Sequence, residues 1–473
     1  MHRYLGLSGI VLLLASAVPA GADAPLRADQ AAFRAIYQEL LETNTALSNG
    51  SCTEAAAKMG ARLRAAGFAD ADLHYFSVPE HPRDGGIVAV LAGRDPAAKP
   101  MLLLAHIDVV EAKREDWTRD PFKLVEEGGY FYARGAMDDK FEAAVWVDTL
   151  IRLRSAPTRP ARTVKMALTC GEETSGAFNG AAYLASHERA LIDAEFALNE
   201  GAWGVLNEAG KPVALEIQAG EKASQNYTLE VTNPGGHSSR PRKDNAIYEL
   251  ATALTRVSAY EFPLQFNATT TAYFKRMATI VGGEMGAAMT ALVTNPADAK
   301  AAAVLERDPN YNGLLHTTCV ATMLSGGHAT NALPQRARAN INCRVFPGMP
   351  LEAVRARLQE VVASPAVGVT MEAARGPEVA PPPLTPGILA PIEAIAAKYY
   401  PGVPVVPVQQ SGGTDGIYLI AVGIPTYGVL GAFVEPDLGH IHGLNERLAV
   451  RSVYDGRDYL YDLVAALAEK QRL

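Results

Sequence analysis

Apolar and polar positions change their spacing along the chain, and the spacing separates helices from strands. Residues 29–47 and 52–68 have the helical period, and Gly67 ends the second helix in the usual way. Short apolar runs then predict strands at residues 86–93, 100–108, 162–170 and 195–201, with helices between them at residues 138–154 and 180–191. Strands that alternate with helices predict an α/β fold whose sheet is at least partly parallel.

The pattern changes after about residue 212 and returns near the C-terminus. Strands are predicted at residues 224–233, 317–327 and 337–348 and helices at residues 245–260 and 351–364, whereas residues 266–315 read only as helix and loop. A Pro-rich connector at residues 376–387 precedes a helix at 388–400 and a strand at 423–431. We therefore predict a mixed-sheet α/β domain, residues 25–219 and 376–473, interrupted by an α+β domain, residues 220–375.

The first 24 residues have the layout of a secretory signal peptide. Arg3 precedes an apolar stretch from Leu5 to Val18, and small residues follow. A membrane anchor would need about 20 apolar residues, and no later segment of the chain has such a run. We expect an exported protein, periplasmic or secreted, with no stable membrane span.

Composition narrows the function further. Over 473 residues the formal net charge is −8, so a nucleic-acid partner is not expected, because phosphate backbones require basic surfaces. The four cysteines are too few for a disulfide scaffold and form no CxxC pair. Cys319 and Cys343 lie in strand-like segments and could pair, but we expect buried free thiols, and we expect Cys170 to serve packing.

Candidate metal ligands follow three of the predicted strands. His106 and Asp108 end one strand, Glu172 and Glu173 another, and Glu200 a third. Carboxyl ends of strands are where ligands gather in open α/β sheets. Asp138 and Asp139 at a helix start, and His440 and His442 near the C-terminus, complete five such segments.

These residues predict a two-metal centre. Imidazole and carboxylate donors without thiolate suit Zn²⁺, with Co²⁺ or Mn²⁺ as substitutes. One carboxylate can bridge two ions about 3.5–4 Å apart, as in two-metal hydrolases. Of two adjacent glutamates, one can bind metal while the other accepts a proton from water. We expect Asp108 to accept a hydrogen bond from the His106 ring and so fix its tautomer.

An ordered set of motifs closely resembles the M20 family of metallopeptidases and N-acyl-amino-acid hydrolases: "AHID", "ARGAMDDK", "CGEET", "NEG", "NPGGHSSRP", "NALP", "CRVFPG", "SGGTDG" and "IHGLNER". The residues of "NPGGHSS" and "SGGTDG" are most similar to those of the carboxypeptidase S and N-fatty-acyl-amino-acid hydrolase branch. The resemblance covers nearly the whole chain after the leader. It implies a mixed-sheet zinc-peptidase catalytic domain with an inserted α+β lid domain, through which family members often dimerise.

The resemblance also implies a role for each residue. His106 and Glu200 would bind one zinc ion, His442 and Glu173 the other, and Asp138 would bridge them. Asp139 and His440 are the alternatives to Asp138 and His442. The general base would be Glu172, the residue orienting His106 would be Asp108, and the residue stabilising the oxyanion would be His237, in the same site or in a partner's. The substrate would be held by Asn331, Arg344, Gly412, Gly413 and Thr414.

The expected activity is hydrolysis of an amide bond next to a free carboxylate, in a short peptide or an N-acyl amino acid. A dipeptidase or aminopeptidase is one alternative. It would need a group that recognises the substrate's amine, and the sequence does not decide between it and the expected activity. A non-catalytic ligand-binding protein of the same fold is the other, although every expected ligand and the base are present.

Overall fold

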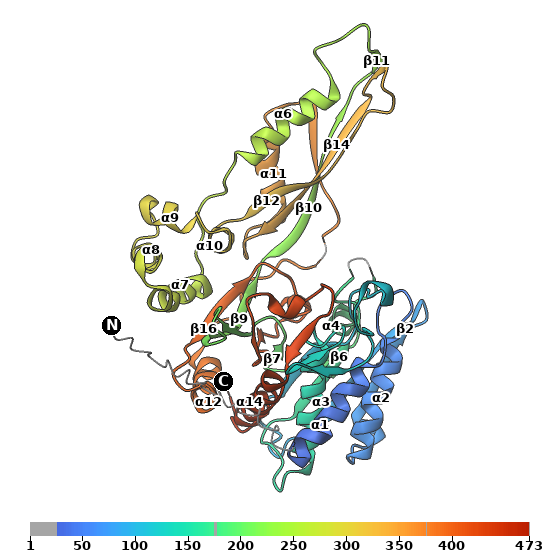
Figure 1. Cartoon of the computed structure of the whole chain (residues 1–473), viewed down its shortest axis with the longest axis vertical. Coiled ribbons are helices and arrows are strands. Elements are labelled where there is room, and N and C mark those ends of the chain that lie inside the picture. Colours follow the sequence, from blue (N-terminus) through green and yellow to red (C-terminus); the bar gives the residue numbers. More distant parts are fainter. Residues whose placement is uncertain (1–25, 175–176, 375, 473) are drawn as a thin grey trace, which may run out of the picture.

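The computed structural model describes residues 26–174, 177–374 and 376–472, so the predicted signal peptide lies outside the described residues. Figure 1 shows two regions, a broad α/β domain and a narrow domain that rises from it to a distant tip. In the parts of the chain that the structure describes, no helix is both long and apolar enough to cross a membrane.

A ten-stranded mixed sheet forms the centre of the α/β domain, with the order β1-β2-β6-β3-β7-β17-β9-β8-β18 and β16 paired with β9. The pairs β3/β6, β3/β7 and β17/β7 are parallel, whereas β1/β2, β2/β6 and β8/β9 are antiparallel. The strands are β1 (Leu73–Val78), β2 (His81–Leu91), β3 (Met101–His106), β6 (Val164–Thr169), β7 (Phe196–Asn199), β8 (Gly204–Leu206), β9 (Pro212–Glu221), β16 (Val405–Gln410), β17 (Thr426–Gly428) and β18 (Phe433–Val434). The predicted α/β fold with a mixed sheet is confirmed.

Helices flank this sheet on both sides. The largest core cluster joins the helices α1, α2, α3, α12 and α14 to the sheet through side chains such as Phe33, Trp146 and Leu463. The predicted apolar face of α1 is buried, because Phe33, Ile36 and Leu40 pack into that cluster. The helices of this domain are α1 (Ala28–Leu41), α2 (Cys52–Ala65), α3 (Lys140–Ser155), α4 (Gly180–His187), α5 (Arg189–Ile192), α12 (Pro386–Tyr399), α13 (Gly416–Ala421) and α14 (Val450–Ala468).

A small antiparallel sheet, β4 (Val125–Glu127), β5 (Tyr130–Tyr132) and β19 (Arg447–Ala449), connects two functional loops. The loop after β5 leads to Asp138, and the loop before β19 carries His442. Pairing of β5 with β19 therefore brings these two loops together although about 300 residues separate them in sequence.

The inserted domain, Ala223–Met371, is built on a four-stranded antiparallel sheet with the order β12-β14-β10-β15. The helices α6 (Ala246–Ser258) and α11 (Leu351–Val362) pack on it around Leu229, Leu250 and Val354. The strands are β10 (Ala223–Thr232), β12 (Thr318–Gly326), β14 (Arg336–Val345) and β15 (Val367–Met371). A two-stranded ladder of β11 (Gly236–His237) and β13 (Ala332–Leu333) lies at the tip (Figure 1).

The region that the sequence left unassigned is helical and belongs structurally to the junction between the domains. Phe274 and Leu292 in this region share a core cluster with Val406 and Val408 of β16. The helices are α7 (Ala268–Val281), α8 (Gly283–Thr294), α9 (Ala299–Leu305) and α10 (Pro309–Leu315). The insertion therefore contacts the α/β domain through these helices as well as through the two chain crossings.

The expectation of free thiols is wrong. Cys319 and Cys343 are directly opposite each other in β12 and β14, and they form a disulfide. Cys170, assigned above to packing, forms a second disulfide with Cys52, from which it is separated by 118 positions. Spacing alone could not reveal the second pair, because only the folded sheet brings α2 beside the end of β6.

Candidate metal centre

The candidate site lies at the carboxyl ends of three neighbouring parallel strands. His106 is the last residue of β3, and the segments carrying Glu172–Glu173 and Glu200 follow β6 and β7. Since β3 pairs in parallel with both β6 and β7, all three ends meet at one edge of the sheet. This arrangement matches the edge at which open α/β sheets hold ligands.

Two groups of side chains converge there and share Asp138. In one, His106 Nε2 lies 3.0 Å from Asp138 Oδ1 and 3.6 Å from Glu200 Oε1. In the other, His442 Nε2 lies 3.1 Å from Asp138 Oδ2 and 2.9 Å from Glu173 Oε2. The two oxygens of one carboxylate therefore face two different histidines, as a bridging ligand requires. Both sets are brought together as the sequence predicts.

The spacing of these atoms fits a pair of zinc-sized ions. Bonds of about 2.0–2.1 Å in a tetrahedral site place neighbouring ligand atoms about 3.3 Å apart, and the four separations here run from 2.9 to 3.6 Å. The donors in both groups are imidazole nitrogen and carboxylate oxygen. A third group, Cys52, Asp108 and Cys170, is unsuited to a metal because its sulfur atoms form a disulfide.

The alternatives weighed for two ligands lie elsewhere. Asp139 is fully buried beside Asp138, and neither of its carboxylate oxygens has a hydrogen-bond partner among the residues that the structure describes. His440 contacts the Leu444 carbonyl and Arg447. Asp138 and His442 are thus the residues that face the other ligands.

Glu446 is a functional residue that sequence reasoning missed. It is fully buried and accepts hydrogen bonds from the backbone N–H groups of Gly135 (3.0 Å), Met137 (2.9 Å) and Asp138 (3.2 Å). Arg134 Nη1 donates to the same carboxylate at 2.8 Å. Glu446 therefore ties the His442 loop to the Asp138 loop. Its place in the sequence "HGLNE", four residues after His442, was the available signal.

Asp108 has different partners from those expected. The His106 ring contacts the backbone carbonyl of Asp108 at 3.1 Å, while the carboxylate lies 3.6 Å away. That carboxylate instead accepts hydrogen bonds from the N–H groups of Glu172 (3.4 Å) and Glu173 (3.1 Å). Asp108 thus orients His106 through its backbone and the two glutamates through its side chain.

The concentration of carboxylates shapes the protonation of the site. Burial lowers the pKa of His106, but Glu200, Asp108 and Asp138 outweigh it and raise that pKa well above the usual value. Hydrogen bonds to Asp138 and Glu173 raise the pKa of His442 to about 10. Burial raises the pKa of Glu172 well above its ordinary value.

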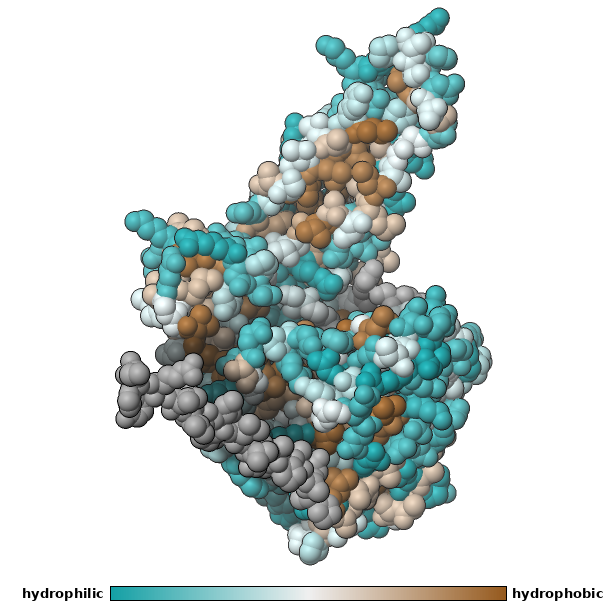
Figure 2. Space-filling model, viewed as in Figure 1, coloured by the Kyte–Doolittle hydropathy of each residue, from teal (hydrophilic) through white to brown (hydrophobic). Residues whose placement is uncertain are grey.

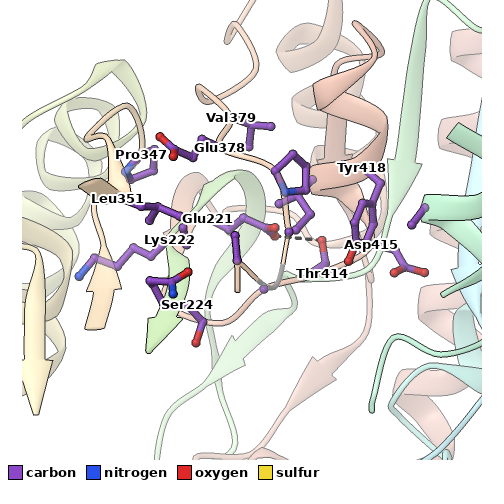
Figure 3. Close-up of a pocket in the computed structure, with 18 of the residues that line it drawn as sticks. Glu221, Lys222, Ser224, Pro347, Leu351, Glu378, Val379, Thr414, Asp415 and Tyr418 are labelled. Atoms are coloured by element: carbon purple, nitrogen blue, oxygen red, sulfur yellow. Dashed lines mark hydrogen bonds between the residues drawn. The ribbon is translucent and has the colours of Figure 1, made fainter. Parts of the chain in front are cut away.

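A cavity of about 920 Å³ adjoins the centre, between the α/β domain and the inserted domain. Its walls include Glu172 together with three of the predicted substrate residues, Arg344, Gly413 and Thr414. Gly412 precedes them in the same loop. Figure 3 shows Glu221 pointing toward Thr414, whose hydroxyl donates to it at 2.9 Å. The Arg344 guanidinium donates to the Ser411 carbonyl at 3.1 Å, so it is held at this loop.

The two remaining candidates are not among the residues that line this cavity. His237 and Asn331 are both exposed at the tip of the inserted domain (Figure 1). The His237 ring contacts the Ser239 hydroxyl at 2.8 Å, and the Asn331 carbonyl accepts a hydrogen bond from Ser238 N–H at 3.0 Å. The structure therefore brings the predicted ligands and base together but not these two residues.

Comparison with known proteins gives consistent matches. Residues 102–466 match the model of peptidase family M20/M25/M40. The chain is 28% identical over 383 residues to N-fatty-acyl-amino acid synthase/hydrolase PM20D1 of Homo sapiens, covering 79% of this chain and 75% of that protein. It is 28% identical over 387 residues to probable carboxypeptidase S-like 2 of Dictyostelium discoideum, covering 79% and 72%.

Among solved structures, the M20 family metallo-carboxypeptidase Sso-CP2 of Sulfolobus solfataricus has a TM-score of 0.67 at 17% identity, covering 94% of this chain and 100% of that one. At this identity the likeness shows a shared fold.

Proposed function

The chain belongs to peptidase family M20/M25/M40, and from that premise we propose that it is an exported dinuclear-zinc hydrolase of N-acyl amino acids. The bond cleaved is an amide next to a free carboxylate, so the C-terminal bond of a short peptide is chemically equivalent. The name of one relative, N-fatty-acyl-amino acid synthase/hydrolase, supports an N-acyl amino acid as substrate. The name of another, probable carboxypeptidase S-like 2, supports cleavage next to a C-terminal carboxylate.

One observation carries the proposal. Two groups of ligand-spaced side chains share Asp138, and the half-buried Glu172 lies in the wall of the adjoining cavity. This combination supplies a place for two cations and, beside it, a carboxylate that can accept a proton from water. The Asp108 side chain accepts a hydrogen bond from the backbone N–H of Glu172 and so holds that residue in place.

Two zinc ions bound here would polarise the scissile carbonyl and make water more acidic. Glu172 takes a proton from water and returns it to the leaving amine. Arg344, with five N–H donors in a fixed plane, binds the free carboxylate of the substrate. Glu446 holds the backbone of Asp138, and Asp108 holds the backbone of Glu172 and Glu173, so that these three side chains keep their positions during the reaction.

The cavity favours an acyl substrate over a dipeptide. Phe346, Met349, Leu351 and Ile417 contribute apolar side chains to its walls, which suits burial of an acyl chain. A dipeptidase would need a carboxylate free to meet the substrate's ammonium group. Two acids of the wall outside the metal centre are buried, and both already accept hydrogen bonds: Glu221 from Gln218 and Thr414, and Asp415 from Thr169 and Asn179. The third wall acid, Glu378, is exposed, and an ion pair with an ammonium group contributes little in such a position.

We further propose that the active form is a homodimer in which His237 of one copy stabilises the oxyanion in the other. Two observations support this proposal: His237 is exposed at the tip, and the edge strand β12 has exposed apolar side chains. This edge strand exposes Val320 by 57%, Met323 by 72% and Leu324 by 70%, and Figure 2 shows hydrophobic surface on the same domain. Exposed apolar edges favour pairing with a second chain.

The decisive experiment is mass-spectrometric detection of released amino acid. Metal-stripped protein and protein reloaded with zinc are each incubated with N-acyl amino acids and with dipeptides. We expect release from N-acyl amino acids by the zinc-loaded form alone. Release chiefly from dipeptides would replace the proposed substrate. No release from either class would favour the ligand-binding alternative. Metal analysis and detection of a cleaved leader in the exported protein test the zinc and the export.

A further inference from the structure

The disulfide between Cys52 and Cys170 lies directly against the catalytic segment. Cys170 is the residue before Gly171, Glu172 and Glu173, and Cys52 is the first residue of α2. Both cysteines are buried, with 1% exposure for Cys52 and 4% for Cys170. The covalent bond therefore joins a helix of the scaffold to the start of the segment that carries the proposed base.

Asp108 connects this disulfide to the two glutamates. A carboxylate oxygen of Asp108 and the two sulfur atoms all lie within 4.8 Å of one another. The same carboxylate accepts hydrogen bonds from the N–H groups of Glu172 and Glu173, at 3.4 and 3.1 Å. Disulfide, Asp108 and the backbone of the glutamates thus form one continuous set of contacts beneath the site.

Two hydrogen bonds also hold the start of this segment. Gly180 N–H donates to the Cys170 carbonyl at 2.7 Å, and the Asn179 amide donates to the Gly171 carbonyl at 3.2 Å. Gly171 has a φ of +94°, a conformation that favours glycine and lets the chain turn immediately after the disulfide. The direction in which Glu172 leaves this turn is set by where Cys170 is fixed.

We propose that the Cys52–Cys170 disulfide is a positioning device for Glu172, so that hydrolysis depends on the oxidation of these two cysteines. This inference rests on the proposed function. Oxidation proceeds by thiol–disulfide exchange with a disulfide oxidant. The Cys52 thiolate attacks the oxidant disulfide and releases one thiol, and the Cys170 thiolate then attacks the Cys52 sulfur and releases the second. Two protein thiols and one oxidant disulfide give one protein disulfide and two thiols.

The test compares two double variants. In C52A/C170A we expect kcat to fall at least about tenfold, because small displacements of a reacting group are costly in rate. KM should stay within about threefold and both metals should be retained, because Arg344 and the ligand side chains are kept. In C319A/C343A, which removes the other disulfide, kcat should stay within about threefold, since that disulfide joins β12 to β14 in the inserted domain.

A second measurement uses the wild-type chain. It is unfolded, reduced with a water-soluble phosphine, refolded with zinc, and assayed before and after oxidation by glutathione disulfide. For each of the two disulfides, reduction consumes one phosphine and one water and yields two thiols and one phosphine oxide. We expect low kcat in the reduced form and recovery on oxidation. Hydrogen exchange of the Glu172 and Glu173 amides in metal-free protein should be faster in C52A/C170A than in C319A/C343A.

Three outcomes overturn the inference. An unchanged kcat in C52A/C170A shows that Glu172 needs no such device, and an equal loss in both variants shows a general effect on folding. Failure of both C52A/C170A and the reduced chain to fold shows a folding role in place of a positioning one. A wild-type protein that cleaves no substrate contradicts the proposed function itself, and the amide exchange rates still test the positioning.

Discussion

The metal centre and the tip of the inserted domain are built in opposite ways. At the centre, His106 is 1% exposed and Asp108 5% exposed, and each has partners from more than one element. At the tip, His237 is exposed and its ring contacts Ser239, two residues away. A side chain held by several neighbours is already oriented for catalysis, whereas an exposed side chain with few contacts needs a binding partner to orient it. The predicted metal ligands and base therefore come from one chain, whereas the tip presents His237 on an exposed surface.

The largest effect is expected at the centre. Glu172→Gln removes the proton acceptor and keeps the side chain's size, so kcat should fall by about 10²–10⁴. Zinc content should stay at the wild-type level, because Glu172 belongs to neither ligand group. Steady-state kinetics and metal analysis of the same sample check both statements. Glu216→Gln, which changes a half-buried acid of β9 that does not line the cavity, is the control and should retain activity.

The tip gives the next largest effect. His237→Ala should lower kcat by about 10²–10³, the usual loss for one oxyanion donor, although no ligand is touched. Mixing His237→Ala with Glu172→Gln should then restore about a quarter of wild-type activity, because a mixed dimer has one complete site. An inactive mixture after verified subunit exchange would contradict action across the dimer. Full activity of His237→Ala alone would remove the residue from the mechanism.

Sequence reasoning succeeded where chemistry is local. The ends of β3, β6 and β7 could be predicted from apolar runs followed by His106, Glu172–Glu173 and Glu200, and parallel pairing then placed them at one edge. The hydrogen-bonding partners of Asp108 could not be predicted, since the backbone and carboxylate of one residue serve different neighbours.

Features that depend on distant pairing were missed. Cys52 and Cys170 come together only when α2 lies beside the end of β6, and α7–α10 show their role only by packing on β16. Periodicity reports which face of an element is apolar, and it does not report which distant element covers that face.

A substitution at Glu446 tests how strongly metal binding depends on the residues that hold the ligand loops in place. Glu446→Gln keeps the size but replaces a carboxylate that accepts from three backbone N–H groups and Arg134. Zinc affinity should fall by about 10–100-fold, the usual effect of losing a residue that positions ligands. Activity should return at high zinc concentration. Unchanged affinity, measured by competition with a chelator, would show that the Asp138 loop holds its shape unaided.

The smallest change in activity is expected at the junction of the two regions. Glu221, the last residue of β9, is 6% exposed, and burial raises its pKa from the ordinary 4.5 to about 8, against hydrogen bonds from Thr414 and Gln218. Because the folded form holds this proton more tightly, its stabilising contribution is complete below pH 4.5 and is lost as pH rises to about 8. Glu221→Gln cannot ionise, so its free energy of unfolding relative to wild type should rise across that window by roughly 1–4 kcal/mol. Denaturant titrations of both proteins at several pH values measure how the difference in unfolding free energy changes with pH. A difference that does not change with pH would show that Glu221 is ionised in the folded protein.

Glu221 neither binds metal nor supplies the base, so kcat of Glu221→Gln should stay within about threefold of the wild-type value. The junction would then contribute to stability, whereas the metal centre and the tip contribute to catalysis.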